Sequence, residues 1–455
     1  MRDVRPEHRY FDLAPRVVPA DRSSVVEIRP RFDHCRLDDA VEYEVRYLPA
    51  EEFAQRGDWP EHEVRLLRPA GGVLRVEQYF EGEQEHVILV TRVAGAKRER
   101  LGDFRVYSVG PDLLARRPYK GDTHLHSYRS DGRESPAYVA GACRRIGLDF
   151  MAVTDHHRYA PSLEAQRAYE GAPVDLRIFP GEEVHPPDSP VHLVNFGGRS
   201  SVNDLFADEG AYRRGVAQVD ERLGDLPPGV DRYQYASAAW CFERIREAGG
   251  LGVFCHPYWF TDWRYSPGGP VTACLLERQP FDAFEVIGGF TYGEFDSNTL
   301  QAARYYEERA AGRRLPIVGA SDSHGCENPE RGLFGWYYTI VFSPGPELGD
   351  LVRSVKDLYS VAVEDVPGDR PRPVGPFRLV KYALFLLREV LPEHDELCEE
   401  EGRLMLAYAG EAGAGGGNCP VAPGAGEGSP AARDALARLQ GRTAVWMDRC
   451  WGRAR

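Results

Sequence analysis

Six stretches within the first 115 residues alternate apolar and polar side chains with a period of two. Loops rich in Pro, Gly, Asp and Glu separate them, and this pattern predicts half-buried antiparallel strands. The predicted strands are 25–32, 41–48, 63–68, 73–80, 85–93 and 104–110. We therefore expect residues 1–115 to form a β-sandwich-like domain of immunoglobulin-like kind. This region has no cluster of residues of the catalytic or metal-binding types. Its expected role is therefore a cap, an oligomerisation surface or a wall that shapes the substrate site, with a plain scaffold as the alternative.

From residue 119 the pattern changes to short apolar strands that alternate with amphipathic helices. The predicted strands are 119–123, 149–154, 176–181, 191–197, 250–255, 281–289 and 315–321, and the predicted helices are 135–147, 162–170, 204–224, 236–249 and 297–312. Repeated strand–helix alternation of this kind favours a parallel sheet, closed or nearly closed into a barrel. We assign this α/β domain to residues 116–366.

Histidine and acidic residues gather where these strands end. Six of the seven strands carry or run into such a cluster: THLH (123–126), TDHH (154–157), GEEVH (181–185), VHLV (191–194), CHPY (255–258) and SDSH (321–324). A parallel barrel places the ends of its strands on one rim, so residues far apart in sequence converge there. The pattern therefore predicts one polar site at that rim.

The residue types in these clusters are those of a metal site. His124 and His126 are two apart in an extended stretch, so their rings leave the same face, and Asp131 follows. Mixed nitrogen and carboxylate ligands suit manganese, zinc or iron better than calcium. The expected ligands are His124, His126, Asp131, His156, Glu183, His192, His256, Asp322 and His324. Six imidazoles and three carboxylates exceed the needs of one or two ions, so we expect up to three divalent metal ions. The alternative is a set of histidines that are hydrogen-bonded inside a barrel without metal, which would leave buried carboxylates unpaired.

Five of these segments, HLHSYRSDG, AVTDHH, PGEEVH, FCHPYW and GASDSHG, resemble the successive motifs of the PHP (polymerase and histidinol phosphatase) domain. The resemblance covers residues 119–340. It implies a distorted (β/α)7 barrel with a trinuclear metal site. The β-rich region ahead of the barrel and the text RPYKGDTHLHS resemble a branch of the family that has an N-terminal β domain and includes carbamate hydrolases.

The resemblance also implies which residues share each ion. It places His124, His126, Glu183 and Asp322 on a first metal, Glu183, His192 and His256 on a second, and Asp131, His156 and His324 on a third. Glu183 is thus the expected bridging ligand, with the neighbouring Glu182 as the alternative. Family members often have histidine where this chain has Asp131, and both residue types can act as ligands.

Such a site performs hydrolysis without a serine or cysteine nucleophile. Two metal ions can bridge a water, lower its pKa and supply hydroxide near neutral pH. The remaining candidates for catalysis are His157 and His185 as proton donors and Arg331 as a side chain that grips a phosphate or carboxylate. Asp155 is a candidate to orient a ligand imidazole, and Glu285 is expected to be structural. Cys255, as a thiolate nucleophile, is a weaker alternative to a small buried apolar residue.

We therefore expect a metal-dependent hydrolase of a small-molecule substrate, most simply a phosphoesterase. The alternative enzyme is an amide, carbamate or ester hydrolase with the same metal site. A noncatalytic PHP interaction module is the alternative from another class, and loss of ligands would favour it.

The rest of the chain adds little chemistry. Residues 202–235 form a long connection, interpreted as a lid or a surface excursion. A proline-rich linker at 367–376 leads to a helical C-terminal extension over 377–455, with a Gly-rich flexible link at 413–430 and a last helix docked through Trp446 and Trp451.

The overall charge of the protein makes some classes of binding partner unfavourable. With 70 acidic against 56 basic residues the formal net charge is −14, which argues against binding to nucleic acid or to anionic membranes. The start of the sequence lacks an apolar signal core, no apolar run is long enough to span a bilayer, and the nine cysteines include no CxxC pair. These features predict a cytoplasmic protein with free thiols. Assembly into a homo-oligomer is left open.

Overall fold

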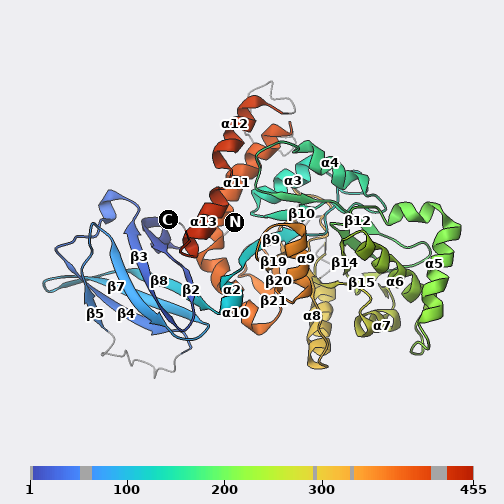
Figure 1. Ribbon diagram of the computed structural model, residues 1–455, viewed down its shortest axis with the longest axis horizontal. Coiled ribbons are helices and arrows are strands. Elements are labelled where there is room, and N and C mark those ends of the chain that lie inside the picture. The colour runs from blue at the N-terminus through green and yellow to red at the C-terminus, as the bar shows by residue number, and fades with distance from the viewer. Residues whose placement is uncertain (1–3, 52–63, 290–294, 328–332, 411–427, 454–455) are drawn as a thin grey trace. The chain divides into compact units, whose positions relative to one another are not determined.

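The computed structural model describes residues 4–51, 64–289, 295–327, 333–410 and 428–453 (Figure 1). These form two compact units. The first unit consists of Met1–Arg117, Lys381–Leu397 and Gly441–Arg455, and the second of Pro118–Val380 and Cys398–Gln440. Because the segments alternate along the sequence, the chain passes between the units four times.

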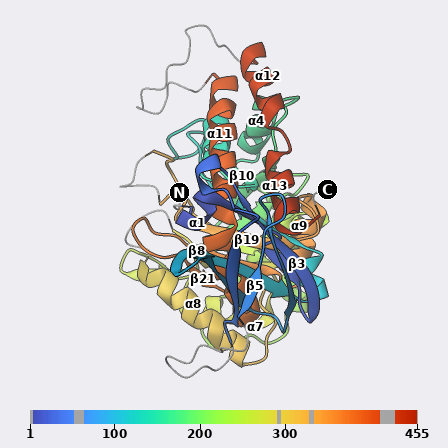
Figure 2. The same cartoon turned by 90° about the vertical axis from the view of Figure 1, so that its left-hand side faces the viewer.

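The first unit is built on two sheets, with strand orders β1-β3-β6 and β2-β8-β7-β4-β5. Its N-terminal elements are α1 (Pro6–Tyr10), β1 (Phe11–Ala14), β2 (Val17–Pro19), β3 (Arg22–Pro30), β4 (Glu42–Pro49), β5 (Arg65–Leu67), β6 (Leu74–Phe80), β7 (Glu85–Ala94), β8 (Lys97–Val109) and α2 (Pro111–Leu114), with a 3-10 turn at Asp33–Cys35. The long strands β3 and β8 are also visible in Figure 2. All six strands predicted from alternation are present, and β1 and β2 add two that the pattern did not indicate.

One hydrophobic cluster joins these two sheets. It contains Ile28 and Leu74 from the first sheet and Ile88 and Phe104 from the second, all fully buried. Inward apolar and outward polar residues alternate along β6, as the period of two requires. The immunoglobulin-like connectivity stays a prediction.

The second unit combines two larger sheets with flanking helices, which confirms the predicted mixed α/β class. The strand orders are β11-β10-β9-β19-β20-β21 and β12-β13-β14-β17-β18. The strands are β9 (Arg117–Asp122), β10 (Phe150–Ala152), β11 (Arg177–Phe179), β12 (Gly181–Val184), β13 (Leu193–Phe196), β14 (Leu251–Phe254), β15 (Trp259–Thr261), β16 (Arg264–Ser266), β17 (Ala283–Ile287), β18 (Ile317–Gly319), β19 (Tyr337–Ser343), β20 (Ser360–Glu364) and β21 (Arg372–Val374). The closed (β/α)7 barrel remains a prediction.

Helices follow most of the strands that carry the polar clusters. They are α3 (Pro136–Arg145), α4 (Ala160–Ala168), α5 (Glu209–Arg222), α6 (Arg232–Glu247), α7 (Gly269–Arg278), α8 (Phe295–Ala310) and α9 (Leu348–Lys356), with a 3-10 turn at Asn203–Ala207. Ser135 caps α3 by accepting a hydrogen bond from the Tyr138 amide. The connection 202–235, interpreted as a lid or an excursion, contains the 3-10 turn, α5 and the start of α6.

The strand directions differ from the all-parallel expectation. Strand β13 pairs antiparallel with both β12 and β14, whereas β9–β10–β11 and β14–β17–β18 are parallel. The cause is the short loop 185–192 between β12 and β13, because parallel neighbours need a crossover of a dozen residues or more. The predicted strand 176–181 also divides at Pro180, and its two halves belong to different sheets.

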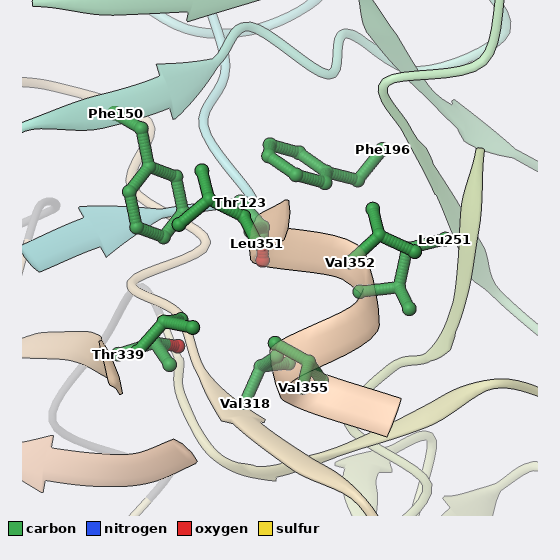
Figure 3. Close-up of a pocket in the computed structure, with 10 residues that line it drawn as sticks. Thr123, Phe150, Phe196, Leu251, Val318, Thr339, Leu351, Val352 and Val355 are labelled. Carbon is green, nitrogen blue, oxygen red and sulfur yellow. The ribbon is translucent and has the colours of Figure 1, made fainter. Parts of the chain in front are cut away.

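Side chains from both sheets of this unit share a second buried cluster, which includes Phe150, Phe196, Leu251 and Val318. A cavity of about 10 Å³ lies among them (Figure 3). Its lining is almost wholly apolar, and α9 contributes three of the side chains around it. A void this small and apolar stays dry, so it is a packing defect of the core rather than a binding site.

In the C-terminal part of the chain, the described residues form the helices α10 (Phe377–Glu389), α11 (Leu391–Tyr408), α12 (Pro430–Leu439) and α13 (Arg442–Cys450). The predicted last helix is divided at Gly441, which has a left-handed φ of 78°. Residues 413–427 of the predicted Gly-rich link lie outside the described residues. Among the helices that the structure describes, none has both the length and the apolar character needed to cross a membrane.

The C-terminal segment docks within the first unit through Trp446 of α13 and through Trp451, which follows the helix. Trp446 donates from Nε1 to the Val390 carbonyl at 3.2 Å, and the Arg16 guanidinium lies 4.7 Å from the centre of its ring. Arg117 stacks on Trp451 in the same way at 4.6 Å.

Candidate metal centre

Backbone pairing beyond the strand ends brings the polar clusters of the second unit together. Leu125 forms a parallel bridge with Ser323, and the His126 amide donates to the Ser323 carbonyl at 3.0 Å. The histidines on either side of Leu125 therefore face the pair on either side of Ser323, Asp322 and His324. A second parallel bridge joins His156 to Glu183.

The Glu183 carboxylate is the centre of the resulting cluster. It is fully buried, and neither oxygen accepts an aligned hydrogen bond from the described residues. Each oxygen instead faces its own group of three imidazole nitrogens. For Oε2 the distances are 3.4 Å to His124 Nε2, 3.5 Å to His126 Nε2 and 2.6 Å to His156 Nδ1, and for Oε1 they are 3.2 Å to His185 Nε2, 3.0 Å to His192 Nδ1 and 3.5 Å to His256 Nε2. A carboxylate with a different set of donors at each oxygen has the geometry of a bridge between two cations.

Asp322 completes the first of these groups. Its Oδ1 lies 2.9 Å from His126 Nε2 and 3.2 Å from His124 Nε2, and the side chain is largely buried. Ligand atoms of His124, His126, Glu183 and Asp322 all lie within 4.8 Å of one another. This is the set expected for the first metal.

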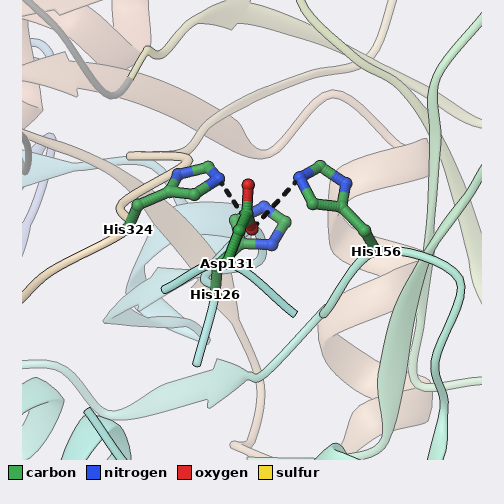
Figure 4. Close-up of side chains that lie close together, drawn as sticks. All are labelled: His126, Asp131, His156 and His324. Atoms are coloured by element: carbon green, nitrogen blue, oxygen red, sulfur yellow. Dashed lines mark ion pairs between the residues drawn. The ribbon is translucent and has the colours of Figure 1, made fainter. Parts of the chain in front are cut away.

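A further group lies around Asp131, at the more exposed side of the cluster. Figure 4 shows the Asp131 carboxylate between the rings of His156 and His324, at 3.5 Å and 3.3 Å from their Nε2 atoms. His126 lies against both rings, with centroid separations of 4.3 Å and 4.2 Å. The residues expected to hold the third ion are therefore close together, with His126 beside them.

The electrostatics of the cluster favour ionised acids. Burial opposes the charge on Glu183 and Asp322, but the surrounding histidines, His124 first, hold the pKa of both carboxyls well below their usual range. Burial likewise opposes a charge on His156, yet the Glu183 carboxylate outweighs it and raises the pKa of His156 to about 10. By contrast, burial lowers the pKa of His126 to about 3. The ionised carboxylates and the neutral His126 ring are the forms that bind metal ions, whereas His156 is protonated next to Glu183 and would release its proton when a metal ion binds.

These observations fit divalent metal ions. Buried polar atoms are normally hydrogen-bonded, but here His124 Nε2, His192 Nδ1 and both Glu183 oxygens have no hydrogen-bond partner among the described residues. Two of the ligand positions, His256 and Asp322, also have positive φ angles of 23° and 49°, a strained backbone that is found mainly where function requires it. A mixed set of nitrogen and oxygen donors of this kind suits manganese, zinc or iron.

Comparison with known proteins adds two kinds of similarity, although no family model matches the chain. Over 78 residues, 16% of this chain, the sequence is 38% identical to DNA polymerase/3'-5' exonuclease PolX of Bacillus subtilis (strain 168). The chain spans only 14% of the length of that relative.

Among solved structures, a two-domain protein from Bacteroides vulgatus that contains a predicted PHP-like metal-dependent phosphoesterase has a TM-score of 0.39 and 18% identity, covering 55% of this chain and 66% of that one. An amidohydrolase from Chromobacterium violaceum, solved with bound sulfate and no metal, has a TM-score of 0.29 and 22% identity over 45% of this chain and 87% of its own. The agreement between this chain and the PHP motifs rests on two observations. The histidine and acidic clusters follow one another in the same order, and they converge at Glu183.

The second unit is similar to PHP proteins in this ordered series of motifs. Affiliation with the branch that has an N-terminal β domain stays a prediction.

Glu182 and Glu183, the two alternatives for the bridge, have opposite surroundings in the second unit. Glu182 accepts four hydrogen bonds, from the side chains of Asn195, Ser201 and Asn203 and from the Val202 amide. Its oxygens are therefore occupied by protein donors, whereas those of Glu183 are not. This difference supports Glu183 as the ligand.

The three residues predicted to act in catalysis differ in where they lie relative to the cluster. His185 lies inside the cluster, 3.1 Å from His156 Nδ1 and stacked on His192 with ring centroids 3.9 Å apart. His157 is exposed at the edge, 4.4 Å from the His185 ring, with a φ of 59°. Arg331 lies outside the described residues.

Of two other expectations, the one for Asp155 was wrong and the one for Cys255 as a small buried residue is confirmed. Asp155 does not orient an imidazole; it accepts hydrogen bonds from the Ser127 amide and hydroxyl and from the Ser130 hydroxyl. It thereby holds the turn between His126 and Asp131. The buried thiol of Cys255 has a raised pKa because of desolvation, which disfavours a thiolate nucleophile.

Two acids support the cluster from outside the predicted ligand set: Glu285, which was expected to be structural, and Asp122, which the sequence did not single out. Glu285, on β17, lies 3.0 Å from His124 Nδ1 and so orients that ring toward Glu183. Asp122 accepts from the His124 amide and from the Ser321 amide and hydroxyl, and burial raises its pKa to about 7. The position of Glu285 on a strand was the available signal, since an acid inside a buried apolar strand needs a partner.

Proposed function

We propose that the second unit is a metal-dependent hydrolase and that its substrate is a small-molecule phosphoester. The observation that carries the proposal is the Glu183 carboxylate, which is buried between two sets of imidazoles and accepts no aligned hydrogen bond from the described residues. A pair of divalent ions bound to such a carboxylate supplies an activated water at neutral pH and neutralises charge on the group that is attacked.

The residues divide this work by position. His124, His126, Asp322 and Glu183 would hold one ion, Glu183, His192 and His256 a second, and Asp131, His156 and His324 a third. Glu285 fixes the ring of His124 through Nδ1. His157, exposed at the edge of the cluster, is the side chain that can give a proton to the leaving group.

Two arginines favour an anionic substrate. Arg133 and Arg158 are exposed, and each follows a predicted ligand, Asp131 or His156, by two residues. The Cδ atom of Arg133 lies 3.3 Å from the Cβ position of Gly325, the residue after His324, so this side chain lies beside the Asp131 group. Neither arginine forms an ion pair within the described part of the chain, which leaves both guanidinium groups free to bind phosphate oxygens.

The test combines metal analysis with a panel of substrates. We expect the purified protein to contain manganese, zinc or iron and to hydrolyse aryl phosphates faster than phosphodiesters, amides, carbamates or carboxylic esters. Glu183→Gln should lose metal and lower kcat/KM by at least about 100-fold. Arg133→Gln should raise KM for phosphates without changing metal content.

The possible results separate the alternatives. Faster turnover of carbamates or amides than of any phosphate would contradict the phosphoester proposal and leave the hydrolase. Full metal content without turnover of any substrate would contradict the hydrolase and favour an interaction module. Unchanged metal content and rate in Glu183→Gln would show that the bridging ligand is wrong.

A further inference from the structure

His185 lies inside the metal centre, yet none of the three proposed ligand sets includes it. Its Nε2 atom is 3.2 Å from Glu183 Oε1. The two proposed ligands at that oxygen lie at similar distances, 3.0 Å for His192 Nδ1 and 3.5 Å for His256 Nε2. By distance, His185 therefore belongs to the same group.

The course of β12 and β13 explains why His185 lies there. The two strands are antiparallel with Val184 opposite Leu193, so the next pair beyond the ladder is His185 opposite His192. Their rings stack, with centroids 3.9 Å apart and planes at 20°. Because side chains alternate along an extended chain, His185 also leaves the same face as Glu183, two residues before it. The strand register thus places both imidazoles beside this carboxylate.

The backbone around His185 is held by a side chain from the 3-10 turn at Asn203–Ala207. The Asn203 side-chain amide donates to the Glu183 carbonyl at 2.9 Å, and its oxygen accepts from the His185 amide at 3.4 Å. One side chain therefore spans the two residues and fixes their relative positions. Support of this kind holds ligands in place before an ion binds.

A hydrogen bond alone does not account for the position of the His185 ring. Its Nε2 atom lies 3.1 Å from His156 Nδ1, but His156 turns its other nitrogen toward Asp131, in the set expected for the third ion. Glu183 Oε1 accepts no aligned hydrogen bond from the described residues. Buried polar atoms normally have a partner, and a metal ion next to Oε1 would be a common partner for this oxygen and for the His185 nitrogen.

We propose that His185 is a further ligand of the ion at Glu183 Oε1, and that zinc is selected there by the set of His185, His192, His256 and Glu183. This inference rests on the proposed function and specifies one of its metal positions. Three imidazole nitrogens and one carboxylate oxygen are the number and types of ligand that tetrahedral zinc takes. Manganese instead favours octahedral sets of oxygen ligands.

Metal competition on the full chain tests the inference without turnover. The protein is loaded with zinc, dialysed against excess manganese and analysed for both metals, and its zinc affinity is measured by competition with a chelator. We expect the wild type to keep zinc at this position. His185→Gln should weaken zinc binding by about 100-fold or more, because even the loss of a group that only supports a ligand weakens metal binding by roughly 10- to 100-fold. Glutamine can still hydrogen-bond to His156, but its neutral amide is not a usual zinc ligand.

His157→Gln is the matched control. It removes the adjacent imidazole, whose ring lies 4.4 Å from that of His185 but which belongs to none of the ligand sets. This variant should keep the zinc affinity of the wild type. Thermal unfolding with and without zinc gives a second readout, since zinc should raise the unfolding temperature less in His185→Gln than in the wild type, whatever the stability of each metal-free protein.

The possible results separate this inference from the proposed function. Equal zinc affinity, or an equal rise in unfolding temperature, in His185→Gln and the wild type would overturn the assignment and leave His185 as a hydrogen-bond partner of His156. An equal loss of zinc in His157→Gln would also overturn it, and replacement of all zinc by manganese in the wild type would overturn the selection of zinc. If zinc binding depends on His185 but no substrate is hydrolysed, the inference stands and the hydrolase fails.

Discussion

Glu182 and Glu183 are adjacent in sequence, yet one is surrounded by hydrogen-bond donors and the other by imidazole nitrogens without aligned donors. Strand geometry explains this, because successive side chains of β12 point to opposite faces. At the scale of single residues, the face of the strand therefore decides between an acid held by hydrogen bonds and the acid that we propose as a metal ligand.

This difference makes Glu182→Gln a matched control for Glu183→Gln. At present the Ser201 hydroxyl and the Asn203 amide donate hydrogen bonds to the Glu182 carboxylate. The side-chain amide of glutamine would direct its own hydrogens at these donors. We expect a loss of about 1–3 kcal/mol in the free energy of unfolding, with unchanged metal content. Urea denaturation and metal analysis of both variants check this, and a loss of metal in Glu182→Gln would reverse the assignment.

His86 gives the first unit a pH-dependent stability. It is fully buried, 2.8 Å from the Tyr47 hydroxyl and 2.7 Å from that of Ser108, and burial lowers its pKa to about 4. The ring stays neutral in the folded protein but is protonated in the unfolded chain below about pH 6.5, so stability should fall as the pH drops from 6.5 toward 4.

Urea unfolding of the first unit at pH 7 and pH 5 measures this effect. We expect His86→Gln to be less stable at pH 7 but to lose less stability between the two pH values than the wild type. An equal loss in both proteins would show that other groups carry the pH dependence.

The predicted ligands were recognisable because each lies at or beyond the end of an apolar strand, as His124 and Asp322 do. Their supporting residues were harder to assign. Glu285 was expected only to be structural, and nothing in the sequence indicated that His124 is its partner or that Asp122 accepts hydrogen bonds from the distant Ser321. The role of Asp155 was misjudged for a related reason: its neighbour in sequence is a histidine, but its neighbours in space are Ser127 and Ser130.

At the scale of elements, helices α3 and α11 pack closely through small residues within the second unit. A Cβ atom on Gly402 would lie 2.2 Å from the Arg145 backbone nitrogen, and one on Gly141 would lie 2.6 Å from Leu406 Cδ2. Backbone atoms cannot move aside as a flexible side chain can, so the contact at Gly402 sets the separation of the two helices.

We therefore expect Gly402→Ala to destabilise the protein by about 1–3 kcal/mol despite the better helix propensity of alanine. Gly349 in α9 is the matched control, because a Cβ there meets nothing within 4 Å. Gly349→Ala should be neutral or stabilising by up to about 1 kcal/mol. Thermal unfolding of both variants compares them, and a neutral Gly402→Ala would show that the helices can separate at little cost.

Most elements were predictable from periodicity, but strand direction was not. Alternation and apolar runs located β6, β7, β14 and the major helices, because these patterns follow from local geometry. The antiparallel course of β13 depends on which strands become neighbours after a short loop. The division of the predicted strand at Pro180 likewise depends on two sheets that a local pattern does not describe.

At the scale of the whole molecule, the first unit depends on the last residues of the described chain. The Arg16 amide donates to the Cys450 carbonyl at 2.8 Å, and Trp446 and Trp451 stack on Arg16 and Arg117. A unit made mainly of the first 117 residues is thus completed by Gly441–Arg455.

Deletion of residues 441–455 should therefore destabilise the first unit by at least about 3 kcal/mol, the usual cost of losing one buried tryptophan. Limited proteolysis with mass spectrometry should show new cleavage within residues 4–117. Val445→Ala, which shortens a side chain that is 64% exposed on α13, should leave the cleavage pattern unchanged. Resistance of residues 4–117 in the deletion variant would show that the two sheets are stable alone.

The division of the first unit into three segments also bears on synthesis. A ribosome delivers residue 441 of the chain 324 positions after residue 117, which at ordinary elongation rates takes roughly 16–65 s. During that interval the nascent sheets lack the helices that cover Arg16 and Arg117. Because residues 441–455 are synthesised last, the first unit is completed only at the end of translation.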